Sequence, residues 1–199
     1  MSMTFMIKKS ILMTILLAAL TCGVYPGVVW VIGQLVFHSK ANGSIIVKNG
    51  MPIGSLLIAQ GFTKPEYFHP RNSAAGDKGF DGSNSGATNF SLTNKKYQDA
   101  LLMNIKKVLA ENPQIKEGQI PPDMVATSAS GLDPHISILN AKLQTERIAR
   151  ARGVGGEKIR DLIDSKMSPK TIIGDGFVNV LELNISLDEK FPINIGRAK

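Results

Sequence analysis

The sequence predicts an α+β protein, with one N-terminal transmembrane helix followed by a single mixed α/β extracytoplasmic domain. Two observations carry this prediction. Residues Ser10 to Phe37 contain no charged side chain. The remaining part, about 160 residues long, combines strand-like alternation with helical periodicity and is large enough for one domain with its own core.

The uncharged segment is long enough to cross a membrane. As a helix, its 28 residues would extend about 42 Å, which exceeds a hydrocarbon core of about 30 Å. Lys8 and Lys9 precede it on a short flank, which favours a cytoplasmic N-terminus. We therefore predict a cytoplasmic N-terminus over 1–9, a transmembrane helix over 10–37 and an extracytoplasmic domain over 38–199.

Two other readings of this segment are a cleaved secretory signal and a lipoprotein signal ending at Cys22. Both fit less well, because the apolar run continues well past Cys22 and no small-residue cleavage site precedes a polar stretch. Pro26 breaks ideal helix hydrogen bonding, which membrane helices tolerate. Gly23 and Gly27 would place small residues on one face, where another helix could pack closely.

Composition narrows the function classes. The chain has 23 basic and 16 acidic residues, a formal net charge of +7 and one cysteine. A single cysteine excludes an intrachain disulfide. The basic residues are scattered rather than clustered, so the charge gives no support to nucleic-acid binding and fits a surface near anionic lipid.

The first elements of the domain are a hairpin, a loop and a helix. Ser44–Lys48 and Ile53–Ile58 read as strands joined at Asn49-Gly50, a pair that supplies the positive φ angles of a tight turn. Residues 61–91 are rich in Gly, Ser, Asn and Pro and predict a long irregular loop, either functional or held by a partner. Lys95–Ala110 has the apolar spacing of an amphipathic helix.

Three further elements follow. We predict a helix over Ser137–Arg152, stopped by Gly153, and a second helix over Glu157–Met167. Leu181–Leu187 alternates between apolar and polar residues, and this period of two predicts a half-buried strand.

Two segments resemble functional sites: Gly61–Arg71 and Thr127–Ser137. The second contains Ser130, Asp133 and His135, but members of a catalytic triad meet in the fold, not along the chain, and no nucleophile-elbow motif is present. Asp133-Pro134-His135 fits better as the opening of the following helix, where Asp or Ser caps free amides and Pro suits the first turn. His69, His135 and Asp133 lack metal-ligand spacing, so no metal site is predicted.

At these segments the chain strongly resembles the C subunit of the bacterial Kdp-type potassium-transporting ATPase. The resemblance spans the apolar helix and nearly all of the domain, and its most specific motif is Ser130-Gly131-Leu132-Asp133-Pro134-His135-Ile136-Ser137. The other matching runs are Gly54-Ser55, Ile58-Ala59-Gln60-Gly61-Phe62, Tyr67-Phe68-His69-Pro70-Arg71-Asn72-Ser73-Ala74, Ser85-Gly86-Ala87-Thr88-Asn89, Arg147-Ile148-Ala149-Arg150-Ala151-Arg152-Gly153 and Val178-Asn179-Val180-Leu181-Glu182-Leu183-Asn184. Gly61 and Gly79-Phe80-Asp81-Gly82 lie in positions that diverge from the family.

The resemblance implies a non-catalytic accessory subunit in the bacterial inner (plasma) membrane. Its implied partners are a channel-like potassium-binding subunit, a P-type subunit that hydrolyses ATP and a small single-helix subunit. Potassium is the implied transported ion. The family's C subunit acts as a catalytic chaperone that raises the ATP affinity of the hydrolysing subunit, and ATP contact is attached to the glutamine matching Gln60.

The residues themselves leave the role of Gln60 open. The chain has neither a Walker-type loop nor the Asp-Lys-Thr-Gly phosphorylation sequence of a P-type pump. The predicted topology also places Gln60 away from cytoplasmic ATP. At the end of a predicted strand, Gln60 could instead satisfy backbone groups or lie in a subunit interface. We predict interface or structural roles for Ser130, Gly131, Asp133, His135, Tyr67, His69 and Arg71.

Two mechanisms of different classes follow. In the first, the domain is an assembly and allosteric subunit that binds one conformation of the pump preferentially. In the second, the chain is a single-pass, membrane-anchored extracytoplasmic hydrolase that uses Ser130 and His135.

Overall fold

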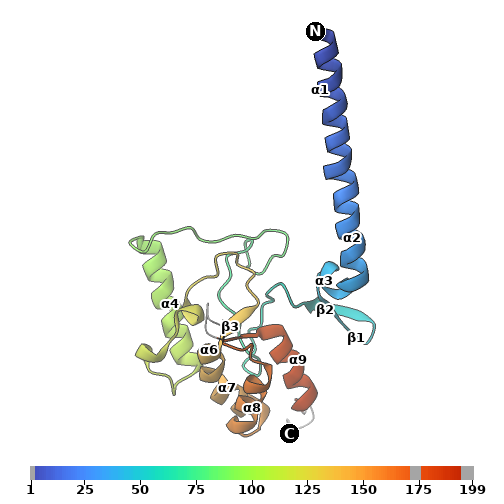
Figure 1. Ribbon diagram of the computed structural model, residues 1–199. Coiled ribbons are helices and arrows are strands. Elements are labelled where there is room, and N and C mark those ends of the chain that lie inside the picture. The colour runs from blue at the N-terminus through green and yellow to red at the C-terminus, as the bar shows by residue number, and fades with distance from the viewer. Residues whose placement is uncertain (1–2, 171–175, 194–199) are drawn as a thin grey trace. The chain divides into compact units, whose positions relative to one another are not determined.

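A computed structural model describes residues 3–170 and 176–193 (Figure 1). The chain divides into two compact units, one ending at Ile45 and the other beginning at Ile46. The predicted class, mixed helix and sheet after one N-terminal apolar helix, is confirmed.

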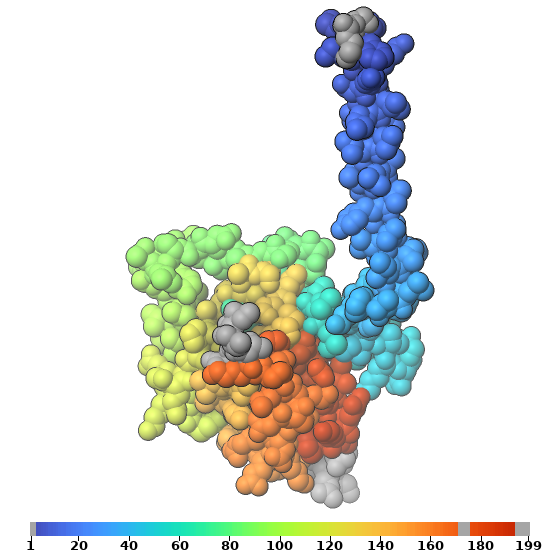
Figure 2. Space-filling model, in the orientation of Figure 1, coloured from blue at the N-terminus to red at the C-terminus, as the bar shows by residue number. Residues whose placement is uncertain are grey.

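The N-terminal unit is dominated by one helical stretch, Met3–Val36. It comprises α1 (Met3–Ala18), a π-helical segment (Ala19–Val24) and α2 (Tyr25–Val36), and is followed by the short α3 (His38–Ala41). The stretch has 34 residues and a mean hydropathy of 2.1, so it is long and apolar enough to cross a membrane. None of its side chains is buried among the described residues, and Figure 2 shows one face of this helix in space-filling form.

The π-helical segment is explained by the missing backbone N–H of Pro26. Pro26 has no N–H, so it cannot donate to the carbonyl of Cys22 one turn earlier. The preceding N–H, that of Tyr25, bonds to the carbonyl of Leu20, five residues back, rather than four. The proline therefore widens the helix locally without ending it, as π-bulges do.

The predicted hairpin is present. β1 (Ile45–Lys48) and β2 (Met51–Ser55) form a two-stranded sheet. Asn49 has φ +53° and Gly50 φ +77°, the two positive angles that a tight hairpin turn requires. β2 begins two residues before the predicted strand and ends three residues before its predicted end, at Ser55, and the chain turns where Ile58 N–H bonds to Ser55 O.

A small core forms around α4 (Lys95–Glu111), which agrees closely with the predicted helix. Asn94 caps it by accepting a hydrogen bond from Lys96 N–H at 2.9 Å. Its apolar face packs against α5 (Pro122–Val125) and against Ile115 and Ile120, which flank a 3-10 turn (Glu117–Gln119). The buried members of this core are Val108, Ile115 and Val125.

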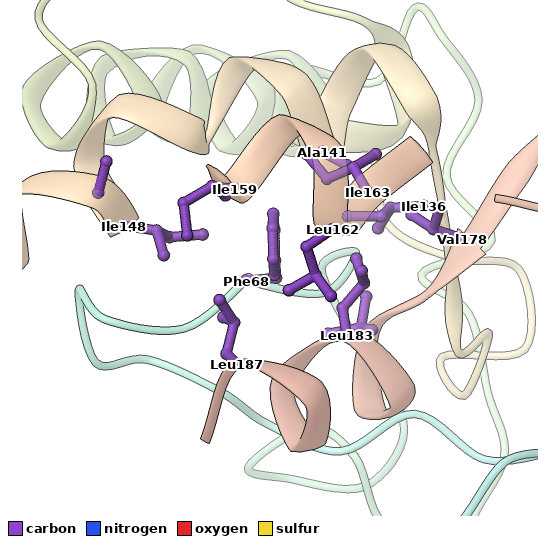
Figure 3. Close-up of a cluster of buried hydrophobic side chains, with 12 residues drawn as sticks. Phe68, Ile136, Ala141, Ile148, Ile159, Leu162, Ile163, Val178, Leu183 and Leu187 are labelled. Carbon is purple, nitrogen blue, oxygen red and sulfur yellow. The ribbon is translucent and has the colours of Figure 1, made fainter. Parts of the chain in front are cut away.

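The main core lies among α6 (Ile138–Leu143), α7 (Thr145–Arg152), α8 (Gly156–Lys166) and α9 (Val180–Lys190). β3 (His135–Ser137) pairs antiparallel with β4 (Phe177–Asn179), with Ile136 opposite Val178. Phe68, from the irregular segment, is fully buried between α8 and α9 (Figure 3). The other buried members are Ile136, Ala141, Ile148, Ala149, Ile159, Leu162, Ile163, Val178, Val180, Leu183 and Leu187.

The predicted strand over Leu181–Leu187 is wrong, because these residues form most of α9. Asn179 caps this helix by accepting from Glu182 N–H at 3.1 Å. Val180, Leu183 and Leu187 share one buried face at helical spacing. The intervening Asn184 and Ser186 are also buried, so the apparent alternation did not separate a core face from a solvent face.

Two other predictions differ in detail. The helix predicted over Ser137–Arg152 is divided at Gln144 into α6 and α7, and it ends as expected at Gly153, which has φ +66°. Residues 61–91 contain no helix or strand beyond a single bridge at Asn72, as predicted. The domain itself holds part of this loop, because Phe68 and Ala75 are fully buried.

Candidate functional site

The structure brings together the two segments that resembled sites. Asn72 and Thr127 form a parallel bridge, and Ser128 N–H donates to Asn72 O at 2.9 Å. Ser73 Oγ donates to Gly131 O at 2.6 Å. Residues 61–75 and 127–137 therefore form one hydrogen-bonded unit, which we call the junction.

Gly131 lies where these backbones approach most closely. Its φ of +69° favours glycine. A Cβ atom there would lie 2.7 Å from both Ala75 N and Gly86 O. The position accepts no side chain without movement of two backbones, which supports a structural role.

Asp133 links the second segment to the first. Its Oδ2 accepts from Arg71 Nη1 at 2.8 Å, and its Oδ1 accepts from His135 N–H at 3.0 Å and lies 3.5 Å from His135 Nδ1. His135, followed by Arg71, lowers the pKa of Asp133 to about 2, although partial burial acts in the opposite direction. Asp133 is therefore a stably ionised partner in this junction.

The expectation that Asp133-Pro134-His135 opens a helix is wrong in position. His135 begins β3 and α6 begins three residues later, at Ile138. The cap is Ser137, whose Oγ accepts from Asn140 N–H at 3.1 Å and donates to Asp123 Oδ1 at 3.0 Å. The carboxylate of Asp133 instead closes a turn onto His135.

Ser130 and His135 have separate surroundings. Ser130 Oγ accepts from Leu132 N–H at 3.1 Å and lies 3.3 Å from Ser128 Oγ. The His135 ring packs edge-on against Phe177, with 4.6 Å between ring centroids. Within 3–170 and 176–193, no hydrogen bond joins Ser130 to an imidazole, so the geometry does not favour the hydrolase alternative.

Tyr67 belongs to a cluster that sequence reasoning missed. Its hydroxyl donates to Asp188 Oδ2 at 3.1 Å, and Arg152 Nη2 donates to Asp188 Oδ1 at 2.9 Å. Arg152 also lies 4.9 Å from the Tyr67 ring centroid, and its side chain is completely buried. Burial, followed by the Asp188 carboxylate, raises the pKa of Tyr67. This cluster joins the irregular segment to α7 and α9.

His69 lies in a second buried group, around Arg147. Arg147 Nη1 donates to Pro65 O at 2.6 Å and Tyr67 O at 3.0 Å, and lies 3.3 Å from His69 Nε2. Glu111 Oε2 is 3.3 Å from His69 Nδ1. Burial, followed by the charge of Arg147, lowers the pKa of His69. The one sequence signal for Arg147 was its place in a matching run.

Gln60 lies five residues past the end of β2, and its side chain contacts the hairpin. Its Nε2 donates to Ile53 O at 3.1 Å. A Cβ on Gly54 would be 2.6 Å from Gln60 Oε1, so the amide occupies the space that glycine leaves. This contact is one of the two roles that the sequence left open for Gln60, which were backbone pairing and a place in a subunit interface.

Among the described residues, no three His, Cys, Asp or Glu side chains lie close enough together to hold a metal ion. His135 and Asp133 are neighbours, whereas His69 lies with Arg147 and Glu111. The three candidates therefore do not form one site.

Comparison with known proteins gives consistent matches over most of the chain. Residues 7–189 match the family model KdpC, described as the K+-transporting ATPase, c chain. The Potassium-transporting ATPase KdpC subunit of Koribacter versatilis is 44% identical over 186 residues, covering 92% of this chain and 94% of that protein. The Nitratidesulfovibrio vulgaris subunit of the same name is 42% identical over 188 residues, covering 94% and 95%, respectively. This chain belongs to the KdpC family.

Proposed function

We propose that the chain is a non-catalytic accessory subunit of an ATP-driven potassium-uptake complex in the bacterial cell membrane. Its similarity to proteins named as potassium-transporting ATPase subunits extends over more than nine-tenths of the chain. In this proposal it raises the ATP affinity of the subunit that hydrolyses ATP, as a catalytic chaperone.

One observation carries the non-catalytic part. The polar residues that first suggested a site are engaged in holding the domain together. Arg71 pairs with Asp133, Tyr67 binds Asp188, and Ser130 Oγ accepts from Leu132 N–H. A domain surface held in place by these internal contacts suits docking against another subunit, because little conformational freedom is lost on binding.

The membrane arrangement is the second part of the proposal. Residues 10–37, most of which lie in the helical stretch Met3–Val36, span the membrane, with residues 1–9 on the cytoplasmic side and residues 38–199 outside. This orientation rests on Lys8 and Lys9. The helix and the domain then contact the channel-like potassium-binding subunit, the P-type subunit and the small single-helix subunit.

An effect on ATP affinity does not require this chain to touch nucleotide. If the domain binds one conformation of the pump more tightly, linkage transmits that preference to every ligand of the same conformation. A preference of about 1.4 kcal/mol changes an apparent affinity tenfold. The amide of Gln60 already binds Ile53 O, which supports a structural role for it in this mechanism.

The decisive experiment compares membranes that contain the other subunits with and without this chain. We expect the chain to co-purify with the complex and to lower the ATP concentration needed for half-maximal potassium-stimulated hydrolysis. A variant lacking residues 1–37 tests the tether and should not support the pump. Equal ATP dependence with and without the chain, in complexes of otherwise identical composition, would refute the chaperone role.

A further inference from the structure

A group of exposed apolar side chains on and just before α4 has no role in the function proposed above. Leu102 and Met103 are 53% and 71% exposed, and Phe90 and Leu92 are 42% and 76% exposed. We call these four residues the α4 patch, and α4 itself lies at one edge of the domain (Figure 1). Single exposed apolar residues are ordinary on a protein surface, whereas a group of them marks an interaction surface.

The α4 patch is held in place although it is not buried. The inner face of α4 packs in the small core, which fixes the helix while Leu102 and Met103 remain exposed. Gln98 Nε2 donates to Leu92 O at 3.2 Å, and this bond ties the preceding turn to the first part of the helix. The apolar side chains are therefore presented to the surroundings on a folded support, and little ordering is needed for them to bind.

The charges beside the patch are mainly positive. Four lysines lie on α4, and within residues 3–170 and 176–193 only Lys107 has a carboxylate partner, Glu111 at 3.9 Å. By contrast, Lys142 on α6 and Lys166 on α8 have carboxylates at 3.0 and 2.8 Å, respectively. The three α4 lysines without such a partner are Lys95, Lys96 and Lys106.

Apolar residues among lysines favour lipid over protein as the occupant. Lysine is depleted at protein–protein interfaces, whereas helices that lie on membranes combine apolar side chains with lysines that reach the headgroups. The chain also keeps this domain near a bilayer. Only residues 37–45 separate the apolar helix from the domain, and such a segment extends about 30 Å at most. A lipid-binding surface on the domain would therefore meet the bilayer at high effective concentration.

We propose that the α4 patch docks onto an anionic membrane surface. Its apolar side chains enter the boundary between headgroups and acyl chains, and the unpaired α4 lysines contact lipid phosphates. Asp99, on the same helix, opposes this attraction but is outnumbered. Docking gives the domain a second attachment besides its helix and so restricts its orientation over the bilayer. This inference rests on the membrane anchoring proposed above, but not on the direction of the helix or on a role in the pump.

The test is tryptophan quenching in the full-length chain, reconstituted in nanodiscs that contain acyl-brominated lipid. Trp30 is the only tryptophan, so Leu92→Trp in a Trp30→Phe background reports on the patch. We expect strong quenching when the other lipid is phosphatidylglycerol and weak quenching when it is phosphatidylcholine, and the signal should fall at high salt. Replacing Lys95 and Lys96 by Gln should lower the ratio of docked to undocked domain about fivefold for each lysine.

Two controls are matched to these variants. Leu139→Trp, in the same background, places the reporter at an exposed apolar position on α6, outside the patch. Replacing Lys158 and Lys190 by Gln removes the same charge from exposed positions on α8 and α9. Neither control should show quenching that depends on anionic lipid or on its own charge change. If circular dichroism shows that the Lys95 and Lys96 variant is misfolded, Lys106→Gln provides the comparison.

Trp30 in the unchanged chain separates failure of docking from failure of anchoring. If Trp30 is not quenched, the helix is not in the bilayer, and both the anchoring and the docking are refuted. If Trp30 is quenched, three results would overturn docking alone. These are quenching of Leu92→Trp no stronger than that of Leu139→Trp, equal quenching in both lipids, and equal losses from the two pairs of lysine substitutions. The first result would leave a protein partner as the occupant of the patch.

Discussion

Arg71 Nη1 donates to Asp133 Oδ2 at 2.8 Å, joining two residues that are 62 positions apart in the chain. The carboxylate is also bound by the backbone N–H of His135. Hydrogen bonds with charged partners are stronger than neutral ones. This contact therefore makes the folding of the junction sensitive to the ionisation of one carboxyl group.

Stability should depend on pH through Asp133. Its pKa is about 2 in the folded chain, below about 3.9 for an unperturbed Asp. The stabilisation is therefore fully present above the unfolded value and disappears as pH falls through about 2. Urea unfolding of wild type and Asp133→Asn should show a constant difference in unfolding free energy above about pH 5 that shrinks below about pH 4. Asp77→Asn, at an exposed position, is the control; an undiminished difference at pH 2 would contradict the assignment.

Gly131→Ala should destabilise the chain more than Gly153→Ala does. Both glycines have similar φ values, +69° and +66°, so each substitution carries the left-handed backbone cost of about 1–2 kcal/mol. At Gly153 a Cβ meets nothing within 4 Å, whereas at Gly131 it meets two backbone atoms at 2.7 Å. The difference between the two variants in their loss of thermal stability therefore measures the cost of the steric clash at Gly131. Similar losses in both variants would show that the junction can open without cost.

Asn184→Ala should be strongly destabilising. Asn184 Oδ1 accepts from Phe68 N–H at 2.8 Å, and its Nδ2 donates to Phe68 O at 3.0 Å, with both residues buried. The alanine would leave two buried backbone groups unpaired, each costing about 1–3 kcal/mol. Urea unfolding measures the loss, with Glu189→Gln on the exposed side of α9 as control. A change below about 1 kcal/mol would indicate that water enters and replaces the amide.

The Asn184 contact also explains why α9 was mistaken for a strand. Leu181, Leu183, Ile185 and Leu187 alternate with Glu182, Asn184 and Ser186, and alternation alone reads as a half-buried strand. In the fold, Asn184 belongs inside because it satisfies the backbone of Phe68, and that residue is 116 positions away. By contrast, α4, α8 and the Asn49-Gly50 turn were predictable because local spacing and turn chemistry decide them.

The residues of the candidate site likewise divide into those that could be predicted from the sequence and those that could not. Its matching motifs identified Tyr67, His69, Arg71 and Asp133 from the sequence. Their partners Arg147, Arg152 and Asp188 could not be assigned, because only the packing of α7 and α9 against the irregular segment brings them into contact. Long-range ion pairs leave no periodic signal in a single sequence.

The proposed topology predicts which positions react from outside the cell. In a Cys22→Ser background, Ser83→Cys should react with a membrane-impermeant thiol reagent in cells whose outer barrier alone is permeable, because Ser83 is exposed in the domain. Thr4→Cys, before Lys8 and Lys9, should react only after the inner membrane is opened. Mass-shift gels measure both. The reverse pattern would invert the orientation inferred from the lysine pair.

The last prediction separates coupling from direct nucleotide contact at Gln60. Its amide donates to Ile53 O and occupies the space above Gly54, so Gln60→Ala should weaken the hairpin's connection to the following chain by about 1 kcal/mol. In the assembled complex, any change in apparent ATP affinity should then follow the amount of this subunit retained, because coupling acts through assembly. Gly54→Ala is a useful comparison, since its Cβ would displace the same amide without removing it. Both variants should act alike, and the full-length chain in nanodiscs should bind no ATP in equilibrium dialysis. Saturable ATP binding by the wild-type chain, lost in Gln60→Ala but kept in Gly54→Ala, would establish direct contact and refute the coupling mechanism.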